Sequence, residues 1–255
     1  MSFLRIIAGM AAITAASCSG SHAPLRIAAA ADLRYALDDL VKTYRDTHVS
    51  ARIDPTYGSS GVFYAQLVSQ APFDLFLSAD IAYPRRLAGQ GLTLAGSEFT
   101  YANGRIVLWT RARTGVDLDR LGIQALRAPA VRHIAIANPA HAPYGRAAEA
   151  ALRSLGIYEA VRDKLVMGEN IAQAFEMAQS GGAEVGIVAL SLAMAPGSAA
   201  QGHYWEVPRG AYPPIVQAGA IMRWTKNPEV AQAFRQFLLA PEGRAILRRY
   251  GFSTD

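Results

Sequence analysis

Short apolar runs alternate with amphipathic segments along most of the chain, and this alternation constrains the fold more than any other feature. Leu25–Ala30 has the pattern of a buried strand, and apolar residues at helical spacing follow it from Leu33 to Tyr44. Further strand patterns occur at residues 51–57, 73–77, 106–110, 133–137, 164–166 and 185–189. Because most of them are followed by a helix pattern, we expect an α/β protein with mainly parallel sheets.

Small or polar residues stand at the junctions where a predicted strand ends and a helix begins. The junctions are Ala31-Asp32, Ser59-Ser60, Pro143-Tyr144 and Asn170-Ile171. The first turn of a helix leaves its N–H groups without partners, and serine or aspartate side chains often cap them. The same N–H groups, together with the helix dipole, also attract anions. Helix capping and anion binding therefore both remain open for the two serines.

Composition limits the classes of partner. With 255 residues, of which 51% are apolar and 18% charged, the chain can bury one large core or two smaller lobes. The net charge is +5, but the basic residues are scattered and not interleaved with aromatic residues, so we expect no nucleic-acid partner. A mildly positive protein suits small anionic ligands, although a generally basic proteome would produce the same balance.

The first 17 residues predict a signal peptide. Arg5 precedes an apolar stretch, Ile6–Ala16, that is too short to span a membrane. Cys18 follows Ala15-Ala16-Ser17, as in a bacterial lipoprotein cleavage box, although Ala15 stands where that pattern prefers leucine. We expect a lipid anchor on Cys18 and a periplasmic or cell-envelope location, with a soluble secreted form as the alternative. As the only cysteine, Cys18 leaves no thiol for a disulfide, a metal site or catalysis in the folded body.

Seven stretches of the mature chain carry a family resemblance. They are "RIAAAADLRYALDDL", "TYGSSGVFYAQL", "APFDLFLSADIAYPRRL", "GSEFTYANGRIVLW", "IAIANPAHAPYGRAA", "AEVGIVAL" and "RRYGF". Together, and in this order, they resemble the periplasmic molybdate-binding proteins of ABC importers. The resemblance implies a two-lobed α/β fold of the type II periplasmic binding proteins, with mixed, mainly parallel sheets and a ligand cleft between the lobes. Residues 24–103 and 217–255 would form lobe 1, and residues 104–216 would form lobe 2.

The resemblance also implies a ligand and the residues that hold it. Molybdate or tungstate would be bound and delivered to an ABC permease in the membrane by a monomeric protein. The oxyanion would contact Ala31 and Asp32 at the first helix start, the N–H and hydroxyl of Ser60, and the backbone N–H groups of Tyr144 and Ile171. No residue would ligate the metal directly. Another tetrahedral oxyanion, such as phosphate, sulfate or chromate, is the alternative ligand.

Two positions depart from the family pattern. Ala189 stands where some members have a ligand tyrosine, and Asp32 stands where relatives have a neutral serine or asparagine. A carboxylate that faced a dianion would repel it, so we expect Asp32 to turn away and cap its own helix through the N–H of Arg34 or Tyr35. In the alternative, Asp32 faces the ligand and accepts a proton from it or is itself protonated, and the ligand then resembles hydrogen phosphate or arsenate.

Other classes of protein fit the sequence less well. "GSSG" at residues 58–61 is not the G-x-S-x-G motif of hydrolases. The five histidines, including His141 near the predicted ligand loop, show neither paired metal spacing nor a local partner for the serines. We therefore expect no catalytic residue and no cofactor. The effector domain of a transcription regulator can share this fold, but the predicted export signal and the lack of a helix-turn-helix argue against it.

Overall fold

The computed structural model describes residues 23–254 and contains two five-stranded sheets. The first sheet has the order β2-β1-β3-β10-β4. Its strands are β1 (Leu25–Ala30), β2 (Ile53–Gly58), β3 (Leu75–Ser78), β4 (Phe99–Gly104) and β10 (Ile215–Ile221). The second sheet has the order β7-β6-β8-β5-β9. Its strands are β5 (Ile106–Arg111), β6 (Ile134–Ala137), β7 (Leu165–Gly168), β8 (Val185–Ala189) and β9 (Gly202–Glu206). The predictions for residues 1–17 and Cys18 lie outside the described residues.

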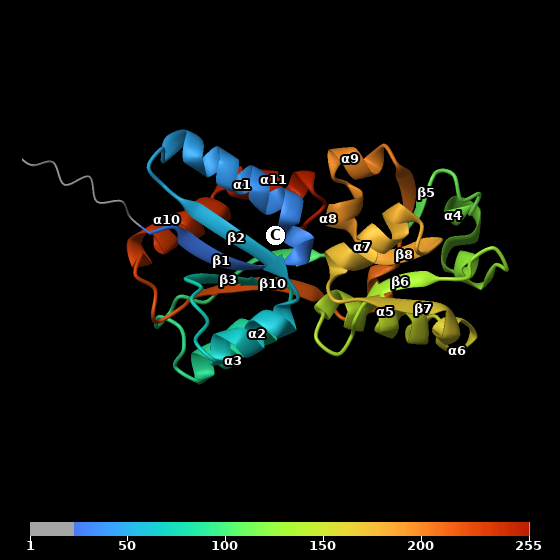
Figure 1. Ribbon diagram of the computed structural model, residues 1–255, viewed down its shortest axis with the longest axis horizontal. Helices are drawn as coiled ribbons and strands as arrows, with labels where there is room; N and C mark the ends of the chain where they lie inside the picture. Colours follow the sequence, from blue (N-terminus) through green and yellow to red (C-terminus); the bar gives the residue numbers. More distant parts are fainter. Residues whose placement is uncertain (1–22, 255) are drawn as a thin grey trace, which may run out of the picture.

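Helices cover both faces of the first sheet, and the side chains of β1 alternate between these faces because a strand repeats every two residues. Leu25, Ile27 and Ala29 lie in one buried cluster and Ala28 lies in another. One face carries α1 (Arg34–Thr47), α10 (Pro228–Leu239) and α11 (Pro241–Arg249), and the other carries α2 (Ser60–Val68) and α3 (Ala82–Gly89) (Figure 1). We call the first sheet and these helices lobe 1.

The second sheet is enclosed in the same way and forms lobe 2. Helix α7 (Ile171–Ser180) lies on one face, and α5 (Pro143–Ser154) and α6 (Tyr158–Val161) lie on the other (Figure 1). The core includes Trp109, whose ring meets that of Phe175 edge-on at a centroid distance of 5.0 Å. The remaining short elements are η1 (Ala31–Leu33), α4 (Leu118–Leu121), η2 (Gly122–Arg127), η3 (Arg162–Lys164), α8 (Leu190–Ala193), α9 (Pro196–Ala199) and η4 (Arg209–Ala211).

Both sheets are mixed, which confirms the α/β prediction. In the first sheet β1 pairs in parallel with β2 and β3, whereas β10 is antiparallel to β3 and β4. The second sheet repeats this plan: β6 is parallel to β7 and β8, and β5 is antiparallel to β8 and β9. Because parallel strands end at the same edge of a sheet, each lobe has one edge at which several helices begin.

The chain passes between the two sheets twice. It leaves the first sheet after β4 and enters the second at β5, and it returns between β9 and β10 through η4 and Pro213-Pro214. Gln217, at which the resemblance starts the second segment of lobe 1, lies within β10. Two short connections between packed lobes are typical of proteins that close around a ligand by hinge motion. Among residues 23–254, no helix has both the length and the apolar character needed to cross a membrane.

Candidate functional site

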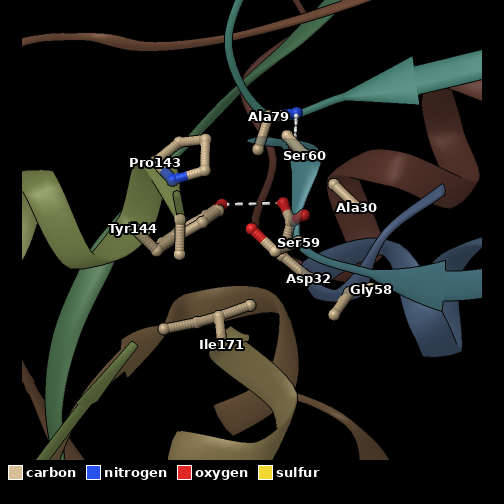
Figure 2. A pocket seen from close by; sticks show the side chains of 11 residues that line it. Ala30, Asp32, Gly58, Ser59, Ser60, Ala79, Pro143, Tyr144 and Ile171 are labelled. Atoms are coloured by element: carbon tan, nitrogen blue, oxygen red, sulfur yellow. Dashed lines mark hydrogen bonds between the residues drawn. The ribbon is translucent and has the colours of Figure 1, made fainter. Parts of the chain in front are cut away.

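A small cavity lies where the helix-starting edges of the two lobes face each other. Its lining includes Ala31 and Asp32 after β1, Ser60 after β2, Tyr144 after β6 and Ile171 after β7 (Figure 2). The structure therefore brings together all five residues that the sequence analysis selected. The topology explains this, since ligands of open α/β sheets bind beyond the carboxyl ends of parallel strands.

The dimensions and lining of the cavity restrict what it can hold. It contains about 190 Å³ of space between atoms, part of which is open to solvent. The space open to the centre of a water-sized sphere is only about 10 Å³, far below the roughly 300–1,000 Å³ of pockets for drug-sized ligands, so this cavity suits a ligand of only a few atoms. Among the described residues that line it, Asp32 is the only one with a charged side chain. Residues 23–254 contain no group of three or more His, Cys, Asp or Glu side chains that could hold a metal ion.

Backbone N–H groups at helix starts are the main donors in the cavity. Ser60 and Ile171 are the first residues of α2 and α7, Tyr144 is the second residue of α5, and Ala31 begins η1, which leads directly into α1. Such N–H groups have no acceptor within their own helix. Among the described residues, none of these four N–H groups donates to an acceptor that lies outside a helix or strand. The cavity therefore presents helix-start N–H donors and the positive ends of helix dipoles, which together favour an anion.

The side chains of the two serines do not cap α2, so of the two roles left open for them, side-chain capping is wrong. The Ser60 hydroxyl oxygen accepts the N–H of Ala79 at 3.0 Å, and the Ser59 hydroxyl donates to the backbone carbonyl of His141 at 2.6 Å. Neither side chain forms a capping bond, because each is engaged by a neighbouring strand end or by the other lobe. The Ser60 hydroxyl keeps its own proton for a ligand, since a hydroxyl that accepts one bond can still donate another.

The two lobes are in contact, and Gly61 permits a close approach between them. Its N–H donates to the carbonyl oxygen of His141 at 3.0 Å, and a Cβ at this position would lie 2.5 Å from the same oxygen. Beside this contact, the guanidinium of Arg146 in lobe 2 pairs with the carboxylate of Asp80 in lobe 1 at 2.6 Å. The glycine after the serines therefore provides room for lobe 2 to close.

Asp32 does not cap its helix, and that prediction is wrong. Its Oδ2 accepts the hydroxyl of Tyr144 at 2.8 Å (Figure 2). The same oxygen accepts the Nε2 N–H of Gln217 at 2.7 Å. Its side chain is 1% exposed, and Oδ1 is buried without a hydrogen-bond partner. The reason is local: η1 starts immediately after β1, so Asp32 lies inside the first helical turn instead of preceding it.

The surroundings of Asp32 favour its neutral form. Burial raises the pKa of Asp32 from 3.8 to about 6, and the hydrogen bonds from Tyr144 and Gln217 offset only part of this effect. Burial also raises the pKa of the Tyr144 and Tyr101 hydroxyls well above 10, so both remain neutral donors. Tyr101 donates to Gln217 Oε1 at 3.0 Å and thereby directs the amide nitrogen toward Asp32.

The sequence analysis missed Gln217 and Tyr101. Both are buried and neither lines the cavity, so they support the site from behind through Asp32. One signal was present in the sequence: Gln217 interrupts the otherwise apolar run "IVQAGAI". A polar side chain inside a buried strand needs a hydrogen-bond partner, and such a residue is often part of a functional network.

Comparisons with known proteins agree with this geometry. The chain is 38% identical over 240 residues to the molybdate-binding protein of Azotobacter vinelandii, a match that spans 94% of this chain and 93% of that protein. It is 40% identical over 199 residues to the molybdate-binding protein of Rhodobacter capsulatus, covering 78% and 76% of the two chains. The solved structure of the periplasmic molybdate-binding protein of A. vinelandii superposes with a TM-score of 0.84 at 33% identity, over 91% of this chain and 99% of that one.

These similarities confirm the resemblance and the two-lobed fold predicted from the sequence. The family model for bacterial extracellular solute-binding proteins matches residues 25–253, which is nearly the whole described chain. The matched region includes both sheets, both connections between them and every residue that lines the cavity. The chain belongs to the family of bacterial extracellular solute-binding proteins.

Proposed function

We propose that this protein captures molybdate or tungstate in the cavity between its lobes and delivers it to an ABC permease. The observation that carries the proposal is the convergence of the helix-start N–H groups of Ala31, Ser60, Tyr144 and Ile171 on one small cavity. The Ser60 hydroxyl and the N–H of Asp32 complete the proposed donor set. The relatives with the same fold and with 38–40% identity are named as molybdate-binding proteins.

Neutral donors are sufficient for a dianion in such a site. A hydrogen bond to a charged group contributes about 1.5–3 kcal/mol, and charge-assisted bonds are stronger than neutral ones. Several of these bonds, formed in a small cavity between the two lobes, give an affinity that needs no arginine or lysine. The small volume of the cavity limits the ligand to a tetrahedral oxyanion or a species of similar size.

Hydrogen phosphate is a second candidate ligand, and one observation favours it. Asp32 lines the cavity with a buried carboxyl oxygen that lacks a partner, and this oxygen can accept a proton from a hydrogen-bearing oxyanion. Molybdate remains our first choice because the relatives that match most of the chain are named for it. Sulfate and chromate have the same shape and serve as comparison ligands.

The family places the protein among those that bind solutes outside the cytoplasm. Beyond this, we propose that it acts as a monomer, without catalysis and without a cofactor, and that a lipid on Cys18 holds it at the membrane near its permease. Ser59 Oγ lies 3.1 Å from Nδ1 of His141, but the Ser59 hydroxyl donates its proton to the His141 carbonyl at 2.6 Å and not to the ring. The relatives that match most of the chain are named as binding proteins, which supports a binding role over an enzymatic one.

Calorimetry with purified protein tests the ligand. Molybdate, tungstate, sulfate, phosphate and chromate are titrated separately, and thermal unfolding is followed at saturation. We expect molybdate and tungstate to bind most tightly and to raise the melting temperature, because a ligand at 1,000 times its Kd stabilises the native state by about 4 kcal/mol. If phosphate binds and molybdate does not, the second candidate replaces the first. If no oxyanion binds at millimolar concentration, the proposed function is wrong.

A further inference from the structure

We propose that binding of a dianionic oxyanion in this cavity takes up one proton from solution, and that Asp32 carries this proton in the complex. The inference rests on the proposed function, since it requires that the cavity holds an oxyanion. It assigns Asp32 a role that a neutral residue at this position could not have: the side chain couples ligand capture to pH.

The position of Asp32 is held from several sides, so its carboxyl group cannot turn away from a ligand. Tyr144 and Gln217 bind Oδ2, and the amide of Gln217 is itself fixed by Tyr101. The backbone carbonyl of Asp32 accepts the hydroxyl of Ser191 at 2.7 Å. These partners come from α5, β10, β4 and α8, and thus from both lobes.

Within residues 23–254, no neighbouring cation neutralises Asp32. The groups that face it are the hydroxyls of Tyr144 and Tyr101, the amide of Gln217 and the hydroxyl of Ser191, all of which are neutral. On its own side of the fold, Arg34 is half-exposed and its guanidinium pairs with Glu176 at 3.0 Å. An ionised Asp32 and a dianion would therefore repel each other in a buried site without compensation.

A single proton removes this repulsion, and the structure provides a place for it. Oδ1 is the carboxyl oxygen that neither Tyr144 nor Gln217 engages, and it is buried without a partner. When protonated, it becomes a hydrogen-bond donor, and an oxygen of the anion becomes its acceptor. The raised pKa of Asp32 in the ligand-free protein supports this step. The negative charge of a bound dianion needs to raise this pKa only a little further for the carboxyl group to be protonated near neutral pH.

Calorimetry of molybdate binding tests the inference. At about pH 7.5, the binding enthalpy is measured in two buffers that differ in ionisation enthalpy, and the difference reports the protons taken up per ligand bound. We expect uptake that approaches one proton in the wild type, and an affinity that falls by about tenfold for each pH unit between about 7 and 8.5. Asp32→Asn should bind molybdate without proton uptake and with an affinity independent of pH. Asp54→Asn, which alters an exposed carboxylate on β2, should behave like the wild type.

The possible outcomes separate the inference from the proposed function. If neither protein binds any oxyanion, the proposed function fails. If the wild type binds molybdate with no proton uptake and with constant affinity, only the inference is overturned. It is also overturned if Asp32→Asn takes up a proton as the wild type does, because the proton then lies elsewhere. Should this variant not fold, infrared difference spectra of wild-type protein with ¹³C-labelled aspartate decide the matter: molybdate must increase the protonated carboxyl band, and an unchanged band refutes the inference.

Discussion

Replacing Asp32 by asparagine should stabilise the ligand-free protein above about pH 6, although it removes a charged residue with two hydrogen bonds. Asparagine has the same shape, and its amide oxygen can still accept the hydroxyl of Tyr144 and the amide of Gln217. What the substitution removes is the free energy needed to keep a buried carboxyl group ionised. This cost follows from the pKa of Asp32, which is about 6 in the folded protein and 3.8 ordinarily.

The magnitude follows from linkage. A difference of one pH unit in pKa corresponds to about 1.4 kcal/mol, so a change from 3.8 to about 6 corresponds to about 3 kcal/mol. The folded protein holds the proton more tightly than the unfolded chain does. The contribution to stability is therefore fully present below pH 3.8 and is lost as the pH rises through about 6. Weaker hydrogen bonds to a neutral amide oxygen offset about 1 kcal/mol of the gain.

Urea and thermal unfolding at several values between about pH 4 and pH 8 measure the effect. We expect Asp32→Asn to exceed the wild type by about 2 kcal/mol at pH 8, or roughly 4–8 °C in melting temperature for a chain of this size. Near pH 4 this advantage should disappear. Asp54→Asn serves as the control for loss of an exposed charge. A difference between Asp32→Asn and the wild type that does not change with pH would refute the reasoning.

The other predictions concern the donors, lobe closure and the export signal. Ser60→Ala should weaken oxyanion binding by about 1.5–3 kcal/mol in calorimetry and lower stability by about 1 kcal/mol, because the N–H of Ala79 also loses its acceptor. Gly61→Ala should stabilise α2 by up to about 1 kcal/mol yet weaken oxyanion binding roughly tenfold or more, because the added Cβ meets the His141 carbonyl. Gly197→Ala, whose added Cβ enters open space, is the control. Equal oxyanion affinities of the two variants would exclude a role of Gly61 in lobe closure. Cys18→Ser should release the protein from membranes in cell fractionation, and an unmodified Cys18 in the mature wild type would contradict lipidation.

The sequence pattern located the strands and helices that meet at the site, whereas their convergence on one cavity was expected only from the family resemblance. Apolar periodicity located the parallel strands and the helices after them, because these patterns are local and a buried strand or an amphipathic helix can be recognised within ten to fifteen residues. Ala31, Ser60, Tyr144 and Ile171 could therefore be identified as helix starts. The strands β4, β9 and β10 were not predicted, since their residues carry no clear alternation and they pair only with strands far away in the chain.

Only the tertiary structure decided what the polar side chains do at these helix starts. Asp32 was expected to cap its helix, and capping was one of the two roles left open for Ser59, because this is the usual local role of both residue types. In the fold, Ser59 binds a carbonyl 82 residues away, and Asp32 binds side chains 112 and 185 residues away. A local pattern contains no information about such partners, because they become neighbours only when two sheets close on each other. The pKa of Asp32, and with it the pH dependence of the site, is therefore a property of the closed pair of lobes.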